Sequence, residues 1–212
     1  MQVFHLGTPL TTASESVDYF VSDRVGLPPS IKEGFVEKIA MMPHTYSVNS
    51  HRDAPPLGTP PPLPPALRLA NLDRKLDPVI WSTWLNALHR VRPTQPMAVL
   101  WLLQGQGKAR QYLKAEAASR GTASRQLEIV ERANHEDHIR RVGAADLYLD
   151  TPRCNSVATA ADLLWAAVPL VATPLETLPS RGSLSLLHAL GHQVGMAATH
   201  KGYEDLVVAT VS

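Results

Sequence analysis

A polar loop of small residues that leads directly into a predicted helix has the composition of a phosphate site. It runs from Asp150 to Asp162 as DTPRCNSVATAAD and follows a predicted strand over 146–150. Free backbone N–H groups and the positive end of the helix dipole favour an anion at such a place. Thr159 could cap the helix or bind a phosphate oxygen, and Asp162 could accept hydrogen bonds from a ribose. The alternative is an ordinary helix cap with an exposed acid in its first turn.

Two histidines three residues apart, His135 and His138, form a second candidate cluster in the segment HEDHIRR. On a helix they would share one face, where Glu136 or Asp137 could add an oxygen ligand for a metal ion. The alternative is a polar helix with acids near its N-terminus and arginines near its C-terminus, as the helix dipole favours. Spacing alone favours the polar helix, so we expect no metal.

Lys75 is a third candidate, because it lies between a predicted strand over 66–71 and a predicted helix start at Asp77-Pro78. Asp77 is a typical N-cap and Pro78 a typical first helical residue. A lysine at that place could reach a diphosphate. The alternative is a solvated surface charge.

Strand and helix patterns alternate through the main segment, residues 66–212. Continuous apolar runs such as AVLWLL at 98–103 are typical of strands covered on both faces. Such alternation predicts an α/β fold with a Rossmann-like, doubly wound parallel sheet, whose ligands bind beyond the carboxyl ends of the strands. The predicted strands are 66–71, 98–103, 126–130, 146–150 and 170–173, and the predicted helices are 77–91, 108–120, 135–143, 160–167, 179–190 and 203–210.

A proline-rich run separates this main segment from a front segment, residues 1–54. Seven prolines fall within 55–65, which predicts an extended linker rather than a helix or sheet strand; a docking site for a proline-binding domain is the alternative. The front segment has an apolar stretch at 17–21 and a predicted helix over 30–40. It is too short to bury a core easily by itself, so we expect it to pack on the main segment or to be the end of another domain.

Composition excludes several classes of protein. The 212 residues carry 20 Lys and Arg against 19 Asp and Glu, a net charge of +1, without the cationic excess of a nucleic-acid-binding protein. The single cysteine, Cys154, excludes an internal disulfide and a cysteine-rich zinc site. The longest apolar run, at 163–175, is too short to span a membrane. No signal peptide is recognised, so we expect no membrane partner.

The strings DTPRCN at 150–155 and ADLLWAAVPLVATPLETLPSR at 161–181 resemble the nucleocytoplasmic protein O-GlcNAc transferases. The family pattern there is DTP-x-CN followed by D-x-LW-x-G-x-P-x-V-x-x-PGET-x-x-SR. The resemblance covers nearly the whole chain, and its other strings are EDHIRR, AVLWLL, LANLDRKLDP, VDYFVSDRV and VEKIAMMPHTYSVNSHRD.

The resemblance implies a GT-B glycosyltransferase built from two Rossmann-like lobes. Residues 66–212 would be the nucleotide-sugar-binding C-terminal lobe, and residues 1–54 the end of the N-terminal catalytic lobe. The implied reaction is inverting transfer of GlcNAc from UDP-GlcNAc to Ser or Thr hydroxyls of acceptor proteins, in the cytoplasm or nucleus. No metal or other cofactor is implied. The family also implies a further N-terminal lobe and tetratricopeptide repeats as partners.

Four of the implied donor-binding positions lie in the phosphate loop or are implied to bind the donor next to it. Lys75 matches the family's lysine on the donor diphosphate, and Asp162 matches the acid that binds the ribose. Ala158 and Thr159 fall in the family's HTTG loop, which reads Val157-Ala158-Thr159-Ala160 here. The loss of a histidine, a threonine and a glycine from that loop predicts weaker donor binding.

The other implied positions address the base and nucleoside. Ala133 matches a residue whose backbone contacts the uracil, and His135 replaces the family's lysine over that ring. His138 matches the histidine beside the uridine, and Arg141 follows in the same pocket. No residue of the chain matches the base that activates the acceptor. Two alternatives stay open: a non-catalytic remnant or interaction module of the same fold, and a protein O-fucosyltransferase that uses GDP-fucose.

Overall fold

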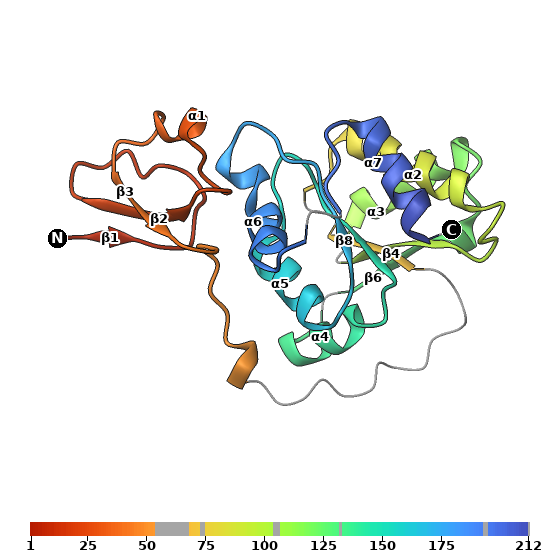
Figure 1. The fold of residues 1–212 in the computed structure, drawn as a ribbon. Helices are drawn as coiled ribbons and strands as arrows, with labels where there is room; N and C mark the ends of the chain where they lie inside the picture. Colours follow the sequence, from red (N-terminus) through yellow and green to blue (C-terminus); the bar gives the residue numbers. More distant parts are fainter. Residues whose placement is uncertain (54–67, 73–74, 104–106, 132, 193–194, 212) are drawn as a thin grey trace.

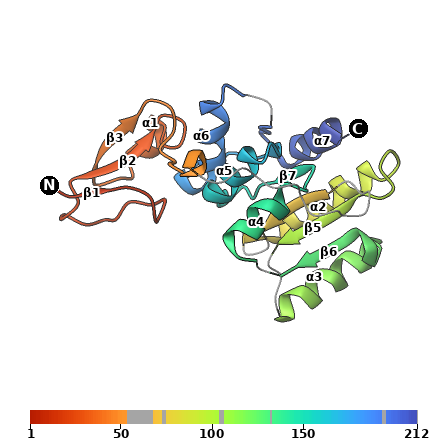
Figure 2. The same cartoon turned by 90° about the horizontal axis from the view of Figure 1, so that it is seen from below.

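The computed structural model describes residues 1–53, 68–72, 75–103, 107–131, 133–192 and 195–211, which form two parallel sheets (Figure 1). The proline-rich run at 55–65 lies outside the described residues, so its extended conformation stays a prediction. The small sheet of the front segment lies beside two helices of the main segment, α5 (Val157–Trp165) and α6 (Gly182–Ala189) (Figure 2).

The main segment forms a five-stranded sheet in which all neighbours are parallel and the order is β6-β5-β4-β7-β8. Its strands are β4 (Arg68–Leu72), β5 (Val99–Leu103), β6 (Leu127–Val130), β7 (Leu147–Leu149) and β8 (Leu170–Val171). The chain begins at the central strand, moves outward to β6, and then returns to the other side of β4. This reversal confirms the predicted doubly wound sheet and places a ligand crevice between the carboxyl ends of β4 and β7.

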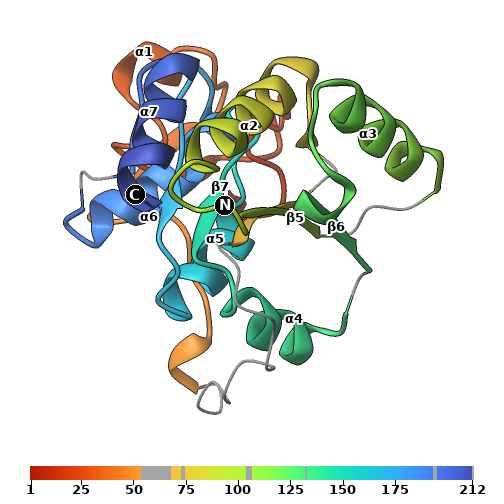
Figure 3. The same cartoon turned by 90° about the vertical axis from the view of Figure 1, so that its right-hand side faces the viewer.

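Helices cover both faces of this sheet, as right-handed crossovers require (Figure 3). The other helices of the main segment are α2 (Pro78–Val91), α3 (Gly107–Ser119), α4 (His135–Val142) and α7 (His200–Val211). Because alternate strand residues face opposite sides, Leu100 and Leu102 share a core with α2 and α7, whereas Trp101 packs with residues of α4 and α5. Among the described residues, no helix is both long and apolar enough to cross a bilayer.

The start of α2 is as the sequence predicts. The Asp77 carboxylate accepts hydrogen bonds from the backbone N–H groups of Val79 at 2.8 Å and Ile80 at 3.1 Å, and Pro78 occupies the first turn. These contacts satisfy two of the N–H groups that a helix start leaves without a backbone partner. The cap fixes where the chain turns after β4, and therefore where Lys75 lies.

The front segment differs from its prediction. It forms the parallel sheet β1-β2-β3, with strands β1 (Val3–Phe4), β2 (Tyr19–Asp23) and β3 (Lys38–Met42). The predicted helix over 30–40 is wrong, because only the short helix α1 (Pro29–Lys32) forms there and the chain then enters β3. Pairing of β3 with β2 over five residues overrides the local helical pattern.

Candidate functional site

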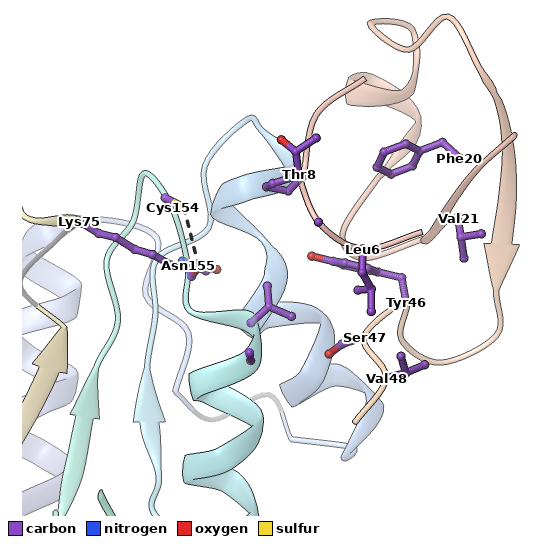
Figure 4. A pocket seen from close by; sticks show the side chains of 14 residues that line it. Leu6, Thr8, Phe20, Val21, Tyr46, Ser47, Val48, Lys75, Cys154 and Asn155 are labelled. Carbon is purple, nitrogen blue, oxygen red and sulfur yellow. Dashed lines mark hydrogen bonds between the residues drawn. The ribbon is translucent and has the colours of Figure 1, made fainter. Parts of the chain in front are cut away.

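A cavity of about 390 Å³ lies between the front and main segments (Figure 4). One wall belongs to the front segment, with residues 6–9 and 46–48. The other wall belongs to the main segment, with Lys75, Cys154 and Asn155 and the first two residues of α5, Val157 and Ala158. This second wall is the crevice at the carboxyl ends of β4 and β7, where doubly wound sheets bind their ligands.

Lys75 links the two strands that border the crevice. It follows β4 by three residues, and its Nζ donates a hydrogen bond to the backbone oxygen of Asn155, in the turn after β7, at 2.5 Å. The side chain is half-buried and lines the cavity. A cation is thereby held at the cavity wall, as binding of an anionic group would require.

The buried carboxylate of Asp150 is hydrogen-bonded to both ends of the turn after β7. This carboxylate accepts hydrogen bonds from the backbone N–H groups of Thr151 at 2.9 Å and Ser156 at 3.1 Å, and from the Ser183 hydroxyl. The Tyr148 hydroxyl donates to Ser156 Oγ at 2.8 Å. The turn therefore reaches the start of α5 with its backbone already ordered.

Burial of Asp150 predicts a pH-dependent stability. Burial raises the pKa of its carboxyl from 3.8 to about 6, and hydrogen bonds from Ser183, Thr151 and Ser156, together with the positive charge of Lys75, offset only part of that rise. Between those values the folded protein holds a proton that the unfolded chain has released, so stability falls as the pH rises from about 4 to about 6.

Asp150→Asn should remove this dependence. We expect the wild type to lose about 2–3 kcal/mol of unfolding free energy across that pH interval relative to Asp150→Asn, measured by urea denaturation at several pH values. Glu33→Gln, at an exposed carboxyl, is the control and should follow the wild type. Parallel pH profiles for wild type and Asp150→Asn would contradict the assignment.

Helix α5 begins three residues earlier than predicted. It starts at Val157 rather than at 160, and its N-cap residue, Ser156, makes no side-chain cap. Thr159 therefore lies inside the first turn and is not the cap, which corrects one of the two roles considered for it. Ala158 lines the cavity, whereas Thr159 is outside its lining. The first-turn N–H groups at this uncapped helix start lie where an anion next to Lys75 could accept from them.

Asp162 lies within α5 and is buried rather than exposed. Its Oδ1 accepts a hydrogen bond from Nε2 of His51, on the front segment, at 2.7 Å. The His51 ring also stacks on Trp165, with 5.5 Å between ring centroids. His51 is not among the predicted site residues, because it lies 111 residues from Asp162 in the chain and no spacing rule connects the two. Asp162 lies outside the lining of the cavity, so its contact with a ribose stays a prediction.

Removing His51 should destabilise the protein. His51→Ala would leave the Asp162 carboxylate buried without its donor, so we expect the free energy of unfolding to fall by about 1–3 kcal/mol in urea denaturation. His44→Ala, at an exposed histidine of the same segment, should change it little. Equal losses in the two variants would show that the contact contributes nothing.

Two of the remaining candidates lie at the start of α4, beyond the carboxyl end of β6, and two lie further along that helix. Ala133, His135, His138 and Arg141 are outside the lining of the cavity that holds Lys75. Since β6 is two strands away from β4, a ligand that touches both Lys75 and the start of α4 must extend about 10 Å. Asn134 caps α4 by accepting from the Asp137 N–H at 2.9 Å.

Arg141 is the unusual residue of this helix. Its Nε and Nη2 are buried and have no hydrogen-bond partner among the described residues, and burial lowers its pKa. His135 is exposed and His138 half-buried. Within the described part of the chain, no three His, Cys, Asp or Glu side chains converge as a metal site would need. Donor binding without a metal stays a prediction.

The sequence model of glycosyl transferase family 41 matches residues 1–56 and 68–211 of the chain. The probable UDP-N-acetylglucosamine–peptide N-acetylglucosaminyltransferase SEC of Arabidopsis thaliana is 35% identical over 223 positions, which cover 99% of this chain and 22% of that protein. The UDP-N-acetylglucosamine–peptide N-acetylglucosaminyltransferase of Caenorhabditis elegans is 35% identical over 134 positions, 63% of this chain and 11% of that protein. The chain thus spans about a fifth or less of the length of these relatives.

Solved structures share the fold. A mutant of the O-GlcNAc transferase of Thermobaculum terrenum matches with a TM-score of 0.85 at 24% identity, over 99% of this chain and 40% of that one. The glycosyltransferase WaaG, involved in lipopolysaccharide biosynthesis, matches with a TM-score of 0.57 at 13% identity, over 96% of this chain and 55% of that one. These likenesses confirm the expected GT-B-type fold.

Proposed function

The chain belongs to glycosyl transferase family 41, and from this premise we propose that it is the donor-binding part of a protein O-linked N-acetylglucosaminyltransferase. Its substrates would be UDP-GlcNAc and the Ser or Thr hydroxyls of acceptor proteins. The relatives from Arabidopsis thaliana and Caenorhabditis elegans carry that activity in their names. We propose that the protein acts in the cytoplasm or nucleus. We also propose that it acts together with a further N-terminal lobe and tetratricopeptide repeats.

One observation carries the proposal: a lysine and an uncapped helix start lie on the same wall of one cavity. Lys75 Nζ bonds the turn at Asn155, and α5 begins two residues later at Val157. A diphosphate bound there would meet a cation and the N–H groups of the first helical turn. In this arrangement Ala158 contacts the phosphates through its backbone, and Thr159 Oγ1 lies one residue further along the same turn.

The remaining candidates suit the nucleoside half of the donor. An extended nucleotide can bridge the two-strand distance from Lys75 to the start of α4, with Ala133 and His135 at the base and His138 and Arg141 beside the uridine. The buried Nε and Nη2 of Arg141, which have no partner among the described residues, support a ligand at this end. Asp162 would use Oδ2 for the ribose, because His51 occupies only Oδ1.

The chemistry asked of this chain is stabilisation of the leaving group. In inverting transfer the acceptor oxygen bonds to the anomeric carbon as the bond from that carbon to the β-phosphate oxygen breaks. Negative charge then develops on UDP, and Lys75 together with the α5 dipole would stabilise it without a metal or other cofactor. The acceptor base is assigned to no residue of this chain.

Calorimetry on the full chain with UDP and GDP tests the proposal. UDP should bind, and more tightly than GDP; preference for GDP would favour fucosyl transfer instead, and no binding of either would contradict donor binding.

A second candidate, a non-catalytic nucleotide-binding module, is favoured by the loop Val157-Ala158-Thr159-Ala160, which lacks the imidazole, one of the two hydroxyls and the glycine of the HTTG pattern. Intact-mass measurement with UDP-GlcNAc and a Ser/Thr-rich peptide separates the two, because only the enzyme adds a GlcNAc.

A further inference from the structure

Two polar groups on residues that line the cavity have no hydrogen-bond partner in the part of the chain that the structure describes. Tyr46, on the front segment, is 5% exposed, and its Oη has no hydrogen-bond partner among the described residues. Asn155, on the main segment, is 3% exposed, and its Oδ1 likewise has none there. Neither atom reaches water. Since buried polar groups are nearly always hydrogen-bonded in folded proteins, their place in one cavity points to a polar ligand.

The Tyr46 hydroxyl lies where the two helices α5 and α6 begin. A Cβ added to Gly182, the first residue of α6, would lie 3.2 Å from Tyr46 Oη and 2.2 Å from Cγ2 of Val157, the first residue of α5. Burial, with Asp23 nearby, raises the pKa of Tyr46 to about 12. The hydroxyl therefore keeps its proton at neutral pH and is available as a hydrogen-bond donor.

The two walls of the cavity differ in charge. The main-segment wall carries the cation Lys75 and the α5 start, whereas the front-segment wall around Tyr46 is uncharged and includes Leu6 and Val48. Figure 4 shows Tyr46 reaching from the front segment toward the side where Asn155 and Lys75 lie. A ligand with an anionic end at Lys75 would therefore present a neutral end to Tyr46.

We infer that the Tyr46 hydroxyl donates a hydrogen bond to an oxygen of the sugar moiety of the donor, and so helps to determine which nucleotide sugar binds. This inference rests on the proposed function, which puts the diphosphate at Lys75. In the unliganded protein the hydroxyl has no partner among the described residues and is covered. A rotation of the side chain toward the cavity that it lines would let the entering sugar supply its acceptor. Tyr46 is thus a specificity-determining residue on the front segment, opposite the diphosphate site.

The test is Tyr46→Phe, which removes one oxygen and keeps the ring. Calorimetry would measure its affinity for UDP and for UDP-GlcNAc beside the wild type and Tyr112→Phe, a control at an exposed tyrosine of α3. We expect Tyr46→Phe to bind UDP-GlcNAc about 3- to 10-fold more weakly and UDP with unchanged affinity. Its unliganded melting temperature should not fall, because the lost hydroxyl had no partner to give up.

The other outcomes are decisive as well. Unchanged binding of both ligands, or equal weakening of both, would overturn the inference while leaving the proposed function intact. A lowered melting temperature without ligand would show that the hydroxyl has a structural partner and would also overturn it. Failure of the wild type to bind UDP would contradict the proposed function itself, and this inference with it.

Discussion

Lys75→Ala is expected to weaken UDP binding by about 10- to 150-fold, the value of a hydrogen bond to a charged group. The physical reason is the position of Nζ, which the bond to the Asn155 backbone oxygen holds at the cavity wall beside the start of α5. Without that cation, only the helix start would face the diphosphate. Calorimetry with UDP on the full chain measures the loss directly.

Two further variants separate charge from structure. Lys75→Met keeps most of the aliphatic stem and should lose as much affinity for UDP as Lys75→Ala, because the charge rather than the stem binds the phosphate. Lys108→Ala removes an exposed lysine of α3 and should bind UDP as the wild type does. Wild-type affinity in Lys75→Ala would remove this lysine from the donor site.

Asp23→Ala is expected to cause the largest loss of stability, about 4 kcal/mol or more in the free energy of unfolding. The Asp23 carboxylate is 1% exposed and accepts four hydrogen bonds. Two come from the backbone N–H groups of Val25 at 2.8 Å and Gly26 at 2.7 Å. The others come from the Tyr46 N–H at 2.8 Å and the Ser185 hydroxyl at 2.6 Å.

This network joins the front segment to the main segment, because Asp23 and Tyr46 belong to the front segment and Ser185 belongs to α6. Alanine would leave the buried donors without an acceptor, whereas Ser185→Ala removes one bond and should cost about 1 kcal/mol. Urea denaturation compares them, with Glu33→Ala as an exposed-acid control. If Asp23→Ala lost no more stability than Ser185→Ala, the network would not hold the segments together.

The five-stranded sheet could be predicted because its signals are local. AVLWLL is apolar throughout, since its strand is covered on both faces, and Asp77-Pro78 marks a helix start through cap chemistry that needs no distant partner. A pattern of five strands separated by helices predicts a parallel sheet, and it predicts that ligands bind at the carboxyl ends of the strands. Lys75 and the turn after β7 meet in the structure for that reason.

What the sequence could not reveal depends on distant contacts. Residues 38–42 become β3 through pairing with β2, not through their own pattern. Helix α5 starts early because Asp150 orders the preceding turn through Thr151 and Ser156. The bond from His51 to Asp162 joins two segments that no spacing rule connects. The orphaned hydroxyl of Tyr46 is visible only once the segments are packed together.

The most direct test of the central claim, that the diphosphate binds between Lys75 and the start of α5, is backbone amide NMR during titration of the full chain with UDP. We predict the largest shift changes at the amides of 157–159, where the N–H groups would bond phosphate oxygens. The chain has a second cavity beside β8, bordered by Pro169, Leu187 and Leu190. Largest changes there, with 157–159 unaffected, would contradict the account.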